Sequence, residues 1–240
     1  LAFNTMADSL EQSEQRRQEF IANVSHELKT PMTTIGGYVD GILDGTISKD
    51  NEKHYLQIVS SEVRRLSRLV RSMLDLSRLQ AQGIDESRKT RFDLGDVMSD
   101  VLITFEQKIN ARGLQVSVDL PEKPVWTKAD RDAITQVVYN LLDNAIKFCP
   151  VGGNLGLILE QDGQKARLRI RNTGQTIPPE ELPLLFDRFH KADKARSADR
   201  EGWGLGLYIA KTIIGAHGGE IWATSENGVT EFTFTLPAVR

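Results

Sequence analysis

Apolar residues recur every three or four positions through the first third of the chain, which predicts two long helices. Residues 1 to about 45 are expected to form the first helix, which ends at Asp44-Gly45-Thr46. Its seam consists of Phe3, Met6, Leu10, Ser13, Arg17, Phe20 and Val24. A second helix is expected from about Asp50 to Gln82, with an apolar stripe formed by Leu56, Val59, Val63, Leu66, Val70 and Met73. A short connection between two such helices predicts an antiparallel hairpin, and its large apolar face predicts that two chains pair into a four-helix bundle.

The pattern changes after a short polar segment, residues 83–90, which we interpret as a linker. From Arg91 onward, short helical patterns are mixed with runs that alternate like strands. Helices are expected at 92–113, 130–148, 178–189 and 205–217, and strands at 114–120, 155–160, 166–171, 220–225 and 231–236. Helices and antiparallel strands without repeated βαβ units predict an α+β two-layer sandwich. The expected fold is therefore an all-α helical hairpin followed by an α+β domain.

Composition narrows the class of protein without identifying it. A length of 240 residues favours two domains, and a formal net charge of −3 gives no reason to expect nucleic-acid binding. The single cysteine, Cys149, excludes an intramolecular disulfide and suits a reducing compartment. No apolar run approaches the roughly 20 residues needed to cross a bilayer, so the chain is expected to be soluble. It starts at Leu1 without a methionine, which is compatible with a fragment of a longer protein.

The segment 20–31 of the first helix carries a histidine on its exposed side. At about 100° per residue, its apolar residues share one face, whereas His26 lies roughly opposite and Thr30 follows one turn later. Glu27 is a carboxylate that could fix the tautomer of the imidazole or accept its proton. Pro31 removes one intrahelical hydrogen bond and is expected to kink the helix. Taken alone, His26 would be read as an ordinary surface histidine.

As a whole, the segment 20–31 resembles the phosphoacceptor box of the sensor histidine kinases of two-component systems. The resemblance implies that His26 is the phosphorylated residue and that Glu27 assists it. Glu27 and Thr30, as H-E-x-x-T, also match the family's phosphatase motif, in which the threonine hydroxyl orients a water. Residues 3–7 and the Glu/Gln/Arg-rich run after them resemble the end of a HAMP signalling module. Its polar seam positions, Ser13 and Arg17, suit either a segment that switches between packings or a simple dimer spacer.

Two asparagines and a lysine share one face of the helix expected at 130–148. Asn140, Asn144 and Lys147 follow each other at i, i+4 and i+7, although asparagine is a poor residue for a helix interior. Amide oxygens suit a hard metal ion and an ammonium group suits phosphate, but a solvated polar face is equally expected for an isolated helix. The segment 139–148 resembles the N box of the histidine-kinase ATP-binding domain, a Bergerat-type fold. That resemblance implies that Asn144 is the magnesium ligand, that Asn140 and Lys147 lie near the phosphates, and that Phe148 packs against adenine.

A glycine-containing segment, 172–177, follows an expected strand and resembles the first glycine box of the same family. The resemblance implies that Asn172, Gly174 and Ile177 line the nucleotide site. Asn172 stands where aspartate is usual, so it offers a carbonyl acceptor without charge assistance to the adenine amino group. Thr176 stands where a second glycine is common. Both departures leave the affinity for adenine open.

A second glycine-rich segment opens the helix expected at 205–217 and resembles the second glycine box. The residues implied near the phosphates are Gly202, Gly204, Leu205, Gly206 and Leu207. Glycines there let backbone N–H groups approach phosphate oxygens at a helix N-terminus. A dinucleotide-binding fingerprint is the competing interpretation, but it requires a preceding strand, and the preceding segment is charged and loop-like.

Three shorter segments complete the resemblance. Residues 186–189 resemble the F box, which makes Arg188 a candidate for contacting the γ-phosphate. The charged segment after it, with Lys191, Lys194, Arg196 and Arg200, would be the ATP lid, or else a solvated loop. Residues 225–230 resemble a third glycine box and add Thr230 to the site, although Val229 stands where a glycine is usual.

Together these resemblances imply the cytoplasmic catalytic core of a sensor histidine kinase that uses ATP and Mg²⁺. The implied domains are the end of a HAMP-like helix at 1–18, a dimerisation and phosphotransfer hairpin at 19–84, and an ATP-binding domain at 85–240. The implied partners are a second copy of the chain and a response regulator whose aspartate receives the phosphoryl group, and the full-length protein would be anchored in the cell membrane. One alternative is a catalytically weak nucleotide-binding scaffold. Another is an ATPase of the chaperone or topoisomerase kind, but such enzymes use a glutamate base where this chain has Asn140.

Overall fold

The computed structural model describes residues 2–82, 85–190 and 203–239 of the chain. It divides into two compact units, Leu1–Leu74 and Asp75–Arg240. The seam positions expected between Phe3 and Arg17 lie in α1, but their side chains fall outside the described residues. Within the described residues, no helix has both the length and the apolar character that crossing a lipid bilayer requires.

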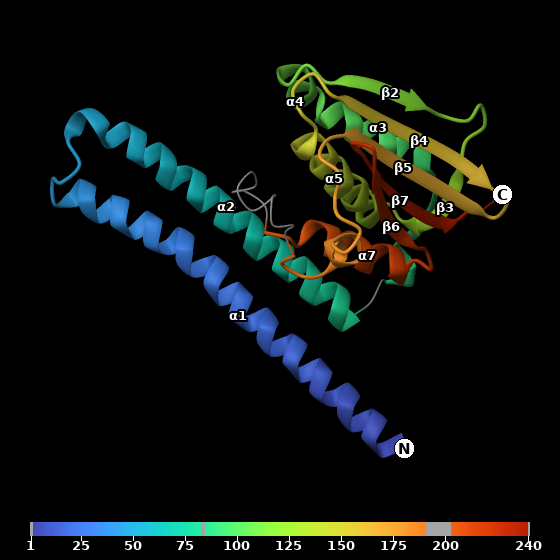
Figure 1. Ribbon diagram of the computed structural model, residues 1–240, viewed down its shortest axis with the longest axis horizontal. Coiled ribbons are helices and arrows are strands. Elements are labelled where there is room, and N and C mark those ends of the chain that lie inside the picture. The colour runs from blue at the N-terminus through green and yellow to red at the C-terminus, as the bar shows by residue number, and fades with distance from the viewer. Residues whose placement is uncertain (1, 83–84, 191–202, 240) are drawn as a thin grey trace. The chain divides into compact units, whose positions relative to one another are not determined.

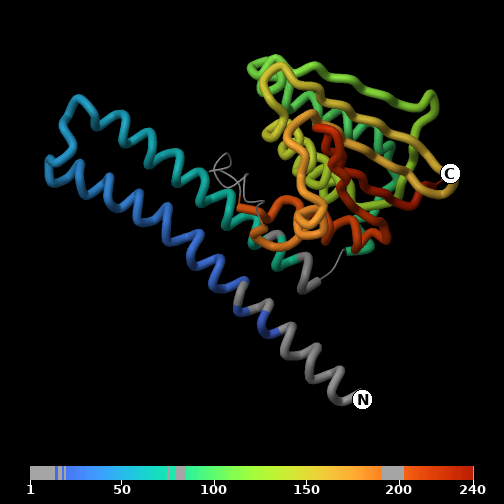
Figure 2. The backbone as a smooth tube through the Cα atoms, in the orientation of Figure 1, coloured from blue at the N-terminus to red at the C-terminus, as the bar shows by residue number. Residues whose placement is uncertain are grey.

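The first unit is built on an antiparallel pair of helices, α1 (Ala2–Leu43) and α2 (Lys49–Gln82) (Figure 1). The smooth trace shows the chain reversing direction between them (Figure 2). At this reversal Gly45 has a φ of +78°, and the carboxylate of Asp44 accepts a hydrogen bond from the backbone N–H of Thr46 at 2.9 Å. The rings of Tyr38 and Tyr55 lie 4.9 Å apart and join the two helices near the turn. The predicted hairpin is therefore confirmed, and α1 continues past the buried Pro31.

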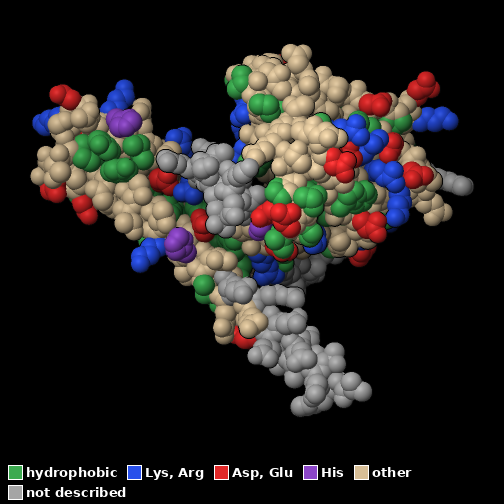
Figure 3. All heavy atoms as spheres, in the orientation of Figure 1, with side chains coloured by type: hydrophobic (Ala, Val, Ile, Leu, Met, Phe, Trp, Pro, Cys, Tyr) green, Lys and Arg blue, Asp and Glu red, His purple; other side chains and the backbone are tan. Residues whose placement is uncertain are grey.

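Much of the apolar surface of the hairpin remains exposed. Its exposed large apolar side chains are Ile21, Met32, Leu43, Leu56, Val63, Val70 and Leu74. An open depression on α2 is lined by Leu66, Ser67, Val70, Arg71 and Leu74. In the space-filling view, hydrophobic side chains gather at the surface of the hairpin (Figure 3). A single copy of the hairpin thus leaves part of its apolar stripe in contact with water.

After the end of α2, the second unit contains a small sheet that local sequence did not predict. A 3₁₀ turn at Glu86–Arg88 leads into β1 (Lys89–Asp93), which pairs antiparallel with β3 (Trp126–Asp130). The interpretation of residues 83–90 as a linker is therefore wrong at its end, where β1 has already begun. The partner of β1, strand β3, is distant in sequence, so the polar residues at 89–90 gave no local indication that they pair in a sheet.

The helix expected at 92–113 is divided into α3 (Leu94–Thr104) and α4 (Glu106–Ala111), with the buried Phe105 between them. A carboxylate oxygen of Asp93 accepts hydrogen bonds from the N–H groups of Gly95 and Val125, both at 3.0 Å. Asp93 therefore caps α3 and also ties its start to the backbone just before β3. Gly113 has a φ of +60° and lies at the end of this helical region, as the sequence predicts.

The main sheet has the strand order β2-β4-β5-β7-β6. Its strands are β2 (Gln115–Asp119), β4 (Asn154–Asp162), β5 (Lys165–Thr173), β7 (Val229–Pro237) and β6 (Ile221–Glu226). The two predicted hairpins, β4–β5 and β6–β7, are both present. The pairing of β2 with β4 is parallel, which differs from the expected antiparallel pattern, because β3 and α5 (Arg131–Phe148) lie between these strands in the chain.

A helical layer of α3, α5 and α7 (Gly206–Ala216) covers one face of the main sheet (Figure 1). Leu157 on β4, Ile170 on β5 and Phe234 on β7 have no exposed surface, nor have Leu141 on α5 and Ile213 on α7. As predicted, Asp130 caps α5, because its carboxylate accepts hydrogen bonds from the N–H groups of Asp132 and Ala133. The predicted α+β two-layer sandwich is confirmed.

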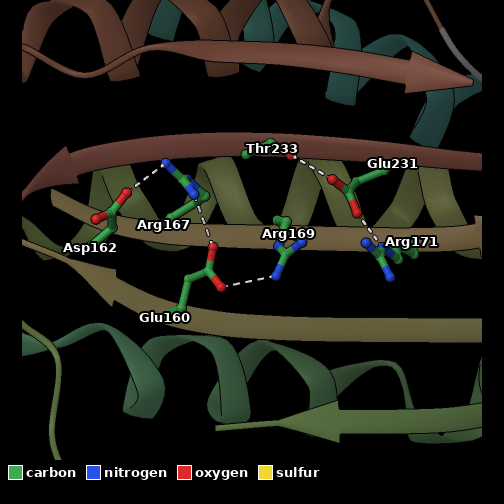
Figure 4. Close-up of polar contacts among 7 residues, drawn as sticks. All are labelled: Glu160, Asp162, Arg167, Arg169, Arg171, Glu231 and Thr233. Atoms are coloured by element: carbon green, nitrogen blue, oxygen red, sulfur yellow. Dashed lines mark hydrogen bonds and ion pairs between the residues drawn. The ribbon is translucent and has the colours of Figure 1, made fainter. Parts of the chain in front are cut away.

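The other face of the sheet is polar and carries a row of arginines along β5 (Figure 4). Glu160 on β4 accepts hydrogen bonds from Arg167 at 3.1 Å and from Arg169 at 3.0 Å. Arg171 pairs with Glu231 on β7. These residues alternate along β5 with the buried Leu168 and Ile170, so the two faces of the strand have opposite character.

His217, at the end of α7, is a buried link between α7 and the start of α5. Its Nε2 accepts a hydrogen bond from the N–H of Asp130 at 3.0 Å, and its Nδ1 lies 2.8 Å from the carbonyl oxygen of Ile213. Because a carbonyl only accepts, Nδ1 carries the proton and the ring is neutral. Burial accordingly lowers the pKa of His217 below its usual value.

Candidate functional site

The imidazole predicted to carry the chemistry of the hairpin lies on the exposed side of α1. His26 is exposed, Glu27 is half-buried, and histidine side chains appear at the surface of the hairpin in the space-filling view (Figure 3). The hydroxyl of Thr30 donates a hydrogen bond to the carbonyl oxygen of His26 at 3.3 Å, so Thr30 follows one helical turn later on the same side. Within the described residues, the imidazole has neither a hydrogen bond nor an ion pair. The ring is therefore accessible to a reactant from solution.

The predicted polar face of α5 meets the start of α7 in the second unit. The side-chain amide of Asn140 donates a hydrogen bond from Nδ2 to the carbonyl oxygen of Gly206 at 3.1 Å. Asn144 lies one turn further along α5, half-buried, and its amide has no hydrogen bond with any described residue. The ammonium group of Lys147 lies 5.3 Å from the ring centre of Phe148. Asn140 is thus fixed by the fold, whereas the amide of Asn144 faces no such partner.

Asn172 anchors a group of hydroxyl residues where β5 ends. The residue is 3% exposed, and Nδ2 donates a hydrogen bond to the carbonyl oxygen of Thr173 at 3.0 Å. Thr230 on β7 is its cross-strand partner and lies, through Oγ1, 2.9 Å from Oγ of Ser225. Ser225 Oγ in turn accepts a hydrogen bond from the N–H of Ile177 at 2.9 Å. The predicted residues Asn172, Ile177 and Thr230 are therefore brought together, and Ser225 joins them.

Thr176 ties this loop to the turn between β6 and β7. Its hydroxyl accepts a hydrogen bond from the N–H of Gly228 at 2.9 Å, and the N–H of Gly174 donates to the carbonyl of Gly228 at 2.8 Å. A Cβ on Gly174 would lie 3.0 Å from the carbonyl oxygen of Phe148, which brings the end of α5 to the same place. A threonine at position 176 therefore has a structural role in this chain that a glycine could not fill.

The glycine-rich turn before α7 forms the other end of the candidate site. Helix α7 begins at Gly206, and within the described residues no side chain caps its first N–H groups. Gly204 has a φ of +68°, and a Cβ there would lie 2.7 Å from the carbonyl oxygen of His190, so glycine is required. Leu205 is buried and Leu207 is half-buried. Gly202 and the predicted lid residues Lys191, Lys194, Arg196 and Arg200 lie outside the described residues.

Arg188 reaches the same end of the site from the segment after the 3₁₀ turn Leu182–Phe186, which replaces the helix expected at 178–189. Its Nη2 donates a hydrogen bond to the hydroxyl of Tyr208 at 2.7 Å. Sequence reasoning did not single out Tyr208 or Ser225. Tyr208 directly follows the glycine-rich segment, and Ser225 begins the segment that resembles a third glycine box. Their places next to these motifs were the only features of the sequence that could have identified them as site residues.

Two family models match the chain. One, described as the His Kinase A (phospho-acceptor) domain, matches residues 16–82. The other, described as the histidine kinase-, DNA gyrase B- and HSP90-like ATPase, matches residues 129–240. The first match contains His26, and the second contains every residue of the candidate nucleotide site.

Curated and solved proteins agree with these matches. The chain is 38% identical over 226 residues to the sensor protein SrrB of Staphylococcus aureus, which is 93% of this chain and 38% of that protein. It is 30% identical to the solved histidine kinase AdeS of Acinetobacter baumannii, with a TM-score of 0.73 over 90% of this chain and 98% of that one. A solved complex of histidine kinase ThkA with the response regulator protein TrrA matches 96% of this chain at 27% identity, with a TM-score of 0.74. The chain spans about two fifths of the length of the curated relatives it matches.

Proposed function

Since this chain belongs to the family of sensor histidine kinases, we propose that it is the catalytic core of an ATP-dependent autokinase that phosphorylates His26. The observation that carries the proposal is the exposed imidazole of His26, in a chain whose residues 129–240 also match the ATPase family model. An accessible neutral imidazole is a competent nucleophile near neutral pH.

ATP would lie along the elements that converge in the second unit. Asn172, with Gly174, Ile177 and Thr230 around it, would hold the adenine, because the bond from Nδ2 to the Thr173 carbonyl leaves Oδ1 as the acceptor for the adenine amino group. Phe148 would pack against the base. The phosphates would lie at the N-terminus of α7, where backbone N–H groups of the glycine-rich turn and the helix dipole favour anions.

A magnesium ion fits the residues present, because Asn144 offers a half-buried amide oxygen on the same helix as Asn140 and Lys147. When bound with ATP, Mg²⁺ would neutralise part of the charge on the phosphate oxygens. Lys147 and Arg188 would contribute positive charge near the same oxygens. Asn140 would keep the start of α7 against α5 through its bond to Gly206.

In the proposed reaction, a ring nitrogen of His26 attacks the γ-phosphorus in line. A nitrogen–phosphorus bond forms, the bond to the bridging oxygen of ADP breaks, and the second ring nitrogen gives up its proton. Glu27 would accept that proton or hold the ring by hydrogen bonding. The phosphoryl group would then pass to an aspartate of a response regulator, a partner class that the complex of ThkA with TrrA supports. Glu27 and Thr30 would also serve the hydrolysis of the phosphorylated regulator.

The proposal includes the organisation of the whole protein. Two copies would pair through the exposed apolar stripe of the hairpin, which the match to the phospho-acceptor domain supports. We retain the limits 1–18 for the end of a HAMP-like helix, 19–84 for the hairpin and 85–240 for the ATP-binding domain. The core would face the cytoplasm in a longer, membrane-anchored protein.

Incubation with γ-labelled ATP tests the proposal directly. The chain is expected to acquire a phosphate that is labile in acid and stable in base, and His26→Gln is expected to lose it completely. His54→Gln is the matched control, because His54 is the other exposed histidine of the hairpin. Equal labelling of the wild-type chain and His26→Gln would refute the proposal.

The scaffold alternative follows from one specific observation, the neutral Asn172 at the base of the site. It requires that the chain bind nucleotide too weakly to use it. Calorimetry with a non-hydrolysable ATP analogue distinguishes the two, since a kinase must bind it in the presence of Mg²⁺ and a scaffold of this kind would not.

A further inference from the structure

The two residues that follow Arg188 in the chain are held by contacts with other segments. The N–H of Phe189 donates a hydrogen bond to the carbonyl of Gly204 at 3.0 Å, and a Cβ on Gly204 would lie 2.7 Å from the carbonyl carbon of Phe189. The next residue is also held, because Nε2 of His190 lies 2.8 Å from a carboxylate oxygen of Glu181. These contacts restrict the position of the backbone at Arg188.

The side chain of Arg188 contacts Tyr208 in two ways. Nη2 donates a hydrogen bond to the tyrosine hydroxyl at 2.7 Å, and the guanidinium carbon lies 4.7 Å from the centre of the ring. A guanidinium over an aromatic ring is attracted by about 0.5–1 kcal/mol at an exposed site. The hydrogen bond to the hydroxyl restricts the direction in which the guanidinium points, and the contact with the ring face restricts its distance from the ring.

Tyr208 occupies the first turn of α7, two residues after the helix begins at Gly206. The helix dipole places partial positive charge at this end, where anions bind favourably and cations are repelled. A guanidinium held near this helix end is therefore repelled electrostatically, and a bound anion would offset that repulsion. A guanidinium has five N–H groups, so a bond from one of them to a hydroxyl is compatible with bonds to phosphate oxygens.

We propose that Tyr208 is a positioning residue that aims Arg188 at the γ-phosphate of bound ATP. The inference rests on the proposed function, because the role of Arg188 at the γ-phosphate belongs to that proposal. Tyr208 acts through Arg188 and touches no reacting atom. It follows that losing Tyr208 should impair contacts to the γ-phosphate and leave contacts to the base and to the other phosphates intact.

A comparison of two nucleotides tests the inference in the full chain. The affinities for ADP and for a non-hydrolysable ATP analogue would be measured by calorimetry in Arg188→Ala, Tyr208→Ala, Tyr208→Phe and the double variant Arg188→Ala/Tyr208→Ala. Arg188→Ala is expected to weaken the ATP analogue about tenfold, as for the loss of one charge-assisted contact, with ADP changed less than about twofold. Tyr208→Ala should weaken only the ATP analogue, by several-fold. The double variant should be no weaker than Arg188→Ala, because Tyr208 then has nothing to position.

Tyr208→Phe keeps the ring and removes only the hydroxyl, so it should lie between wild type and Tyr208→Ala and remains informative if Tyr208→Ala unfolds. Tyr139→Ala is the matched control, since it removes a tyrosine ring that packs 4.7 Å from Phe105 in the same unit, and it should leave the ratio of the two affinities unchanged. Equal weakening of ADP and the ATP analogue in Tyr208→Ala, or additive losses in the double variant, would overturn the inference. If Arg188→Ala changes neither affinity, the premise and the inference both fail, while phosphate labelling of His26 separately decides the kinase activity.

Discussion

The hairpin and the second unit differ in how far they bury the apolar residues that define their helices and strands. In the second unit, Leu141, Leu157 and Leu168 have no exposed surface, because helices cover one face of the central strands of the sheet. On the hairpin, Val63 remains 47% exposed, Val70 44% and Leu74 53%. Each Å² of exposed apolar surface costs about 25 cal/mol relative to burial, so pairing the hairpin stripe with another surface would be favourable. The second unit also exposes apolar side chains, such as Ile103 and Val151, but they lie outside a core that its own helices and sheet close. The second unit completes its core from one chain, whereas the hairpin needs another surface.

The same contrast extends to the candidate chemistry. His26 projects from one helix with no hydrogen bond to its ring within the described residues, which suits the proposed role of receiving a phosphoryl group and passing it on. In the candidate nucleotide site, residues from different elements fix each other, as in the bonds Asn140–Gly206 and Ile177–Ser225. A reactive group that must be reached is left open, and a site that must bind one ligand is fixed in advance.

Charging the exposed stripe of the hairpin should have the largest effect. If two copies pair through this stripe as proposed, the double substitution Val63→Glu/Val70→Glu removes four valines from the interface, at about 1.5 kcal/mol each or about 6 kcal/mol in all. We expect the chain to become monomeric at micromolar concentration, as measured by sedimentation equilibrium. Ser61→Glu is the matched control, because Ser61 is exposed on α2 and lies about 200° around the helix from Val63. A double variant that remains dimeric would show that another surface pairs the chains.

Truncating one side chain in the core of the second unit should be the next largest effect. Leu157→Ala on β4 is expected to lower the free energy of unfolding by about 3 kcal/mol, since it leaves a cavity beneath the helical layer. Its neighbour Ile158 points to the polar face and is only half-buried, so Ile158→Ala should cost about 1 kcal/mol or less. Denaturation followed by tryptophan fluorescence measures this unit alone, because Trp126, Trp203 and Trp222 all lie within it. Equal losses in the two variants would mean that the faces of β4 do not differ as described.

Local sequence patterns were sufficient for the elements that depend on local information. The two long helices, the caps at Asp130 and Gly113, and both hairpins of the main sheet follow from periodicity, capping and turn residues. The pairing of β1 with β3 and the parallel pairing of β2 with β4 were not predicted, because they depend on residues distant in the chain. The break at Phe105 was also missed, since the apolar period continues through it.

The candidate site shows the same division. Asn140 was identified by its spacing on a helix, but its bond to Gly206 depends on how α5 packs against α7. Thr176 looked like a departure from a glycine pattern, and only the fold shows that its hydroxyl bonds to Gly228. Tyr208 carried no motif signal, because its contact with Arg188 joins residues 20 positions apart across two elements.

Mild acid should destabilise the second unit through His217. Burial lowers the pKa of His217, so the folded unit holds the ring neutral while the unfolded chain protonates it near its usual value of about 6.5. The stabilisation is complete above pH 6.5 and is lost as pH falls below it, by up to about 1.4 kcal/mol per pH unit. His217→Gln should reduce this slope between pH 6.5 and 5.5, as measured by urea denaturation with tryptophan fluorescence. His54→Gln, on the hairpin, should leave the slope of the second unit unchanged, and an unchanged slope in His217→Gln would refute the assignment.

The ion pairs on the polar face of the sheet (Figure 4) should contribute least to the free energy of unfolding of the second unit. Glu160 pairs with Arg167 and Arg169, whose side chains are 31% and 25% exposed, and the buried Nε atoms of both arginines have no hydrogen-bond partner within the described residues. Partly solvated pairs with unfilled donors stabilise little, so Glu160→Gln should cost less than about 1 kcal/mol and less still in 1 M salt. Glu226→Gln, at an exposed end of β6, is the control and should change nothing measurable. A decrease in the free energy of unfolding above about 2 kcal/mol, or one that grows with salt, would contradict this prediction. It would mean that the charges of this face stabilise the unit about as much as the apolar core on the opposite face.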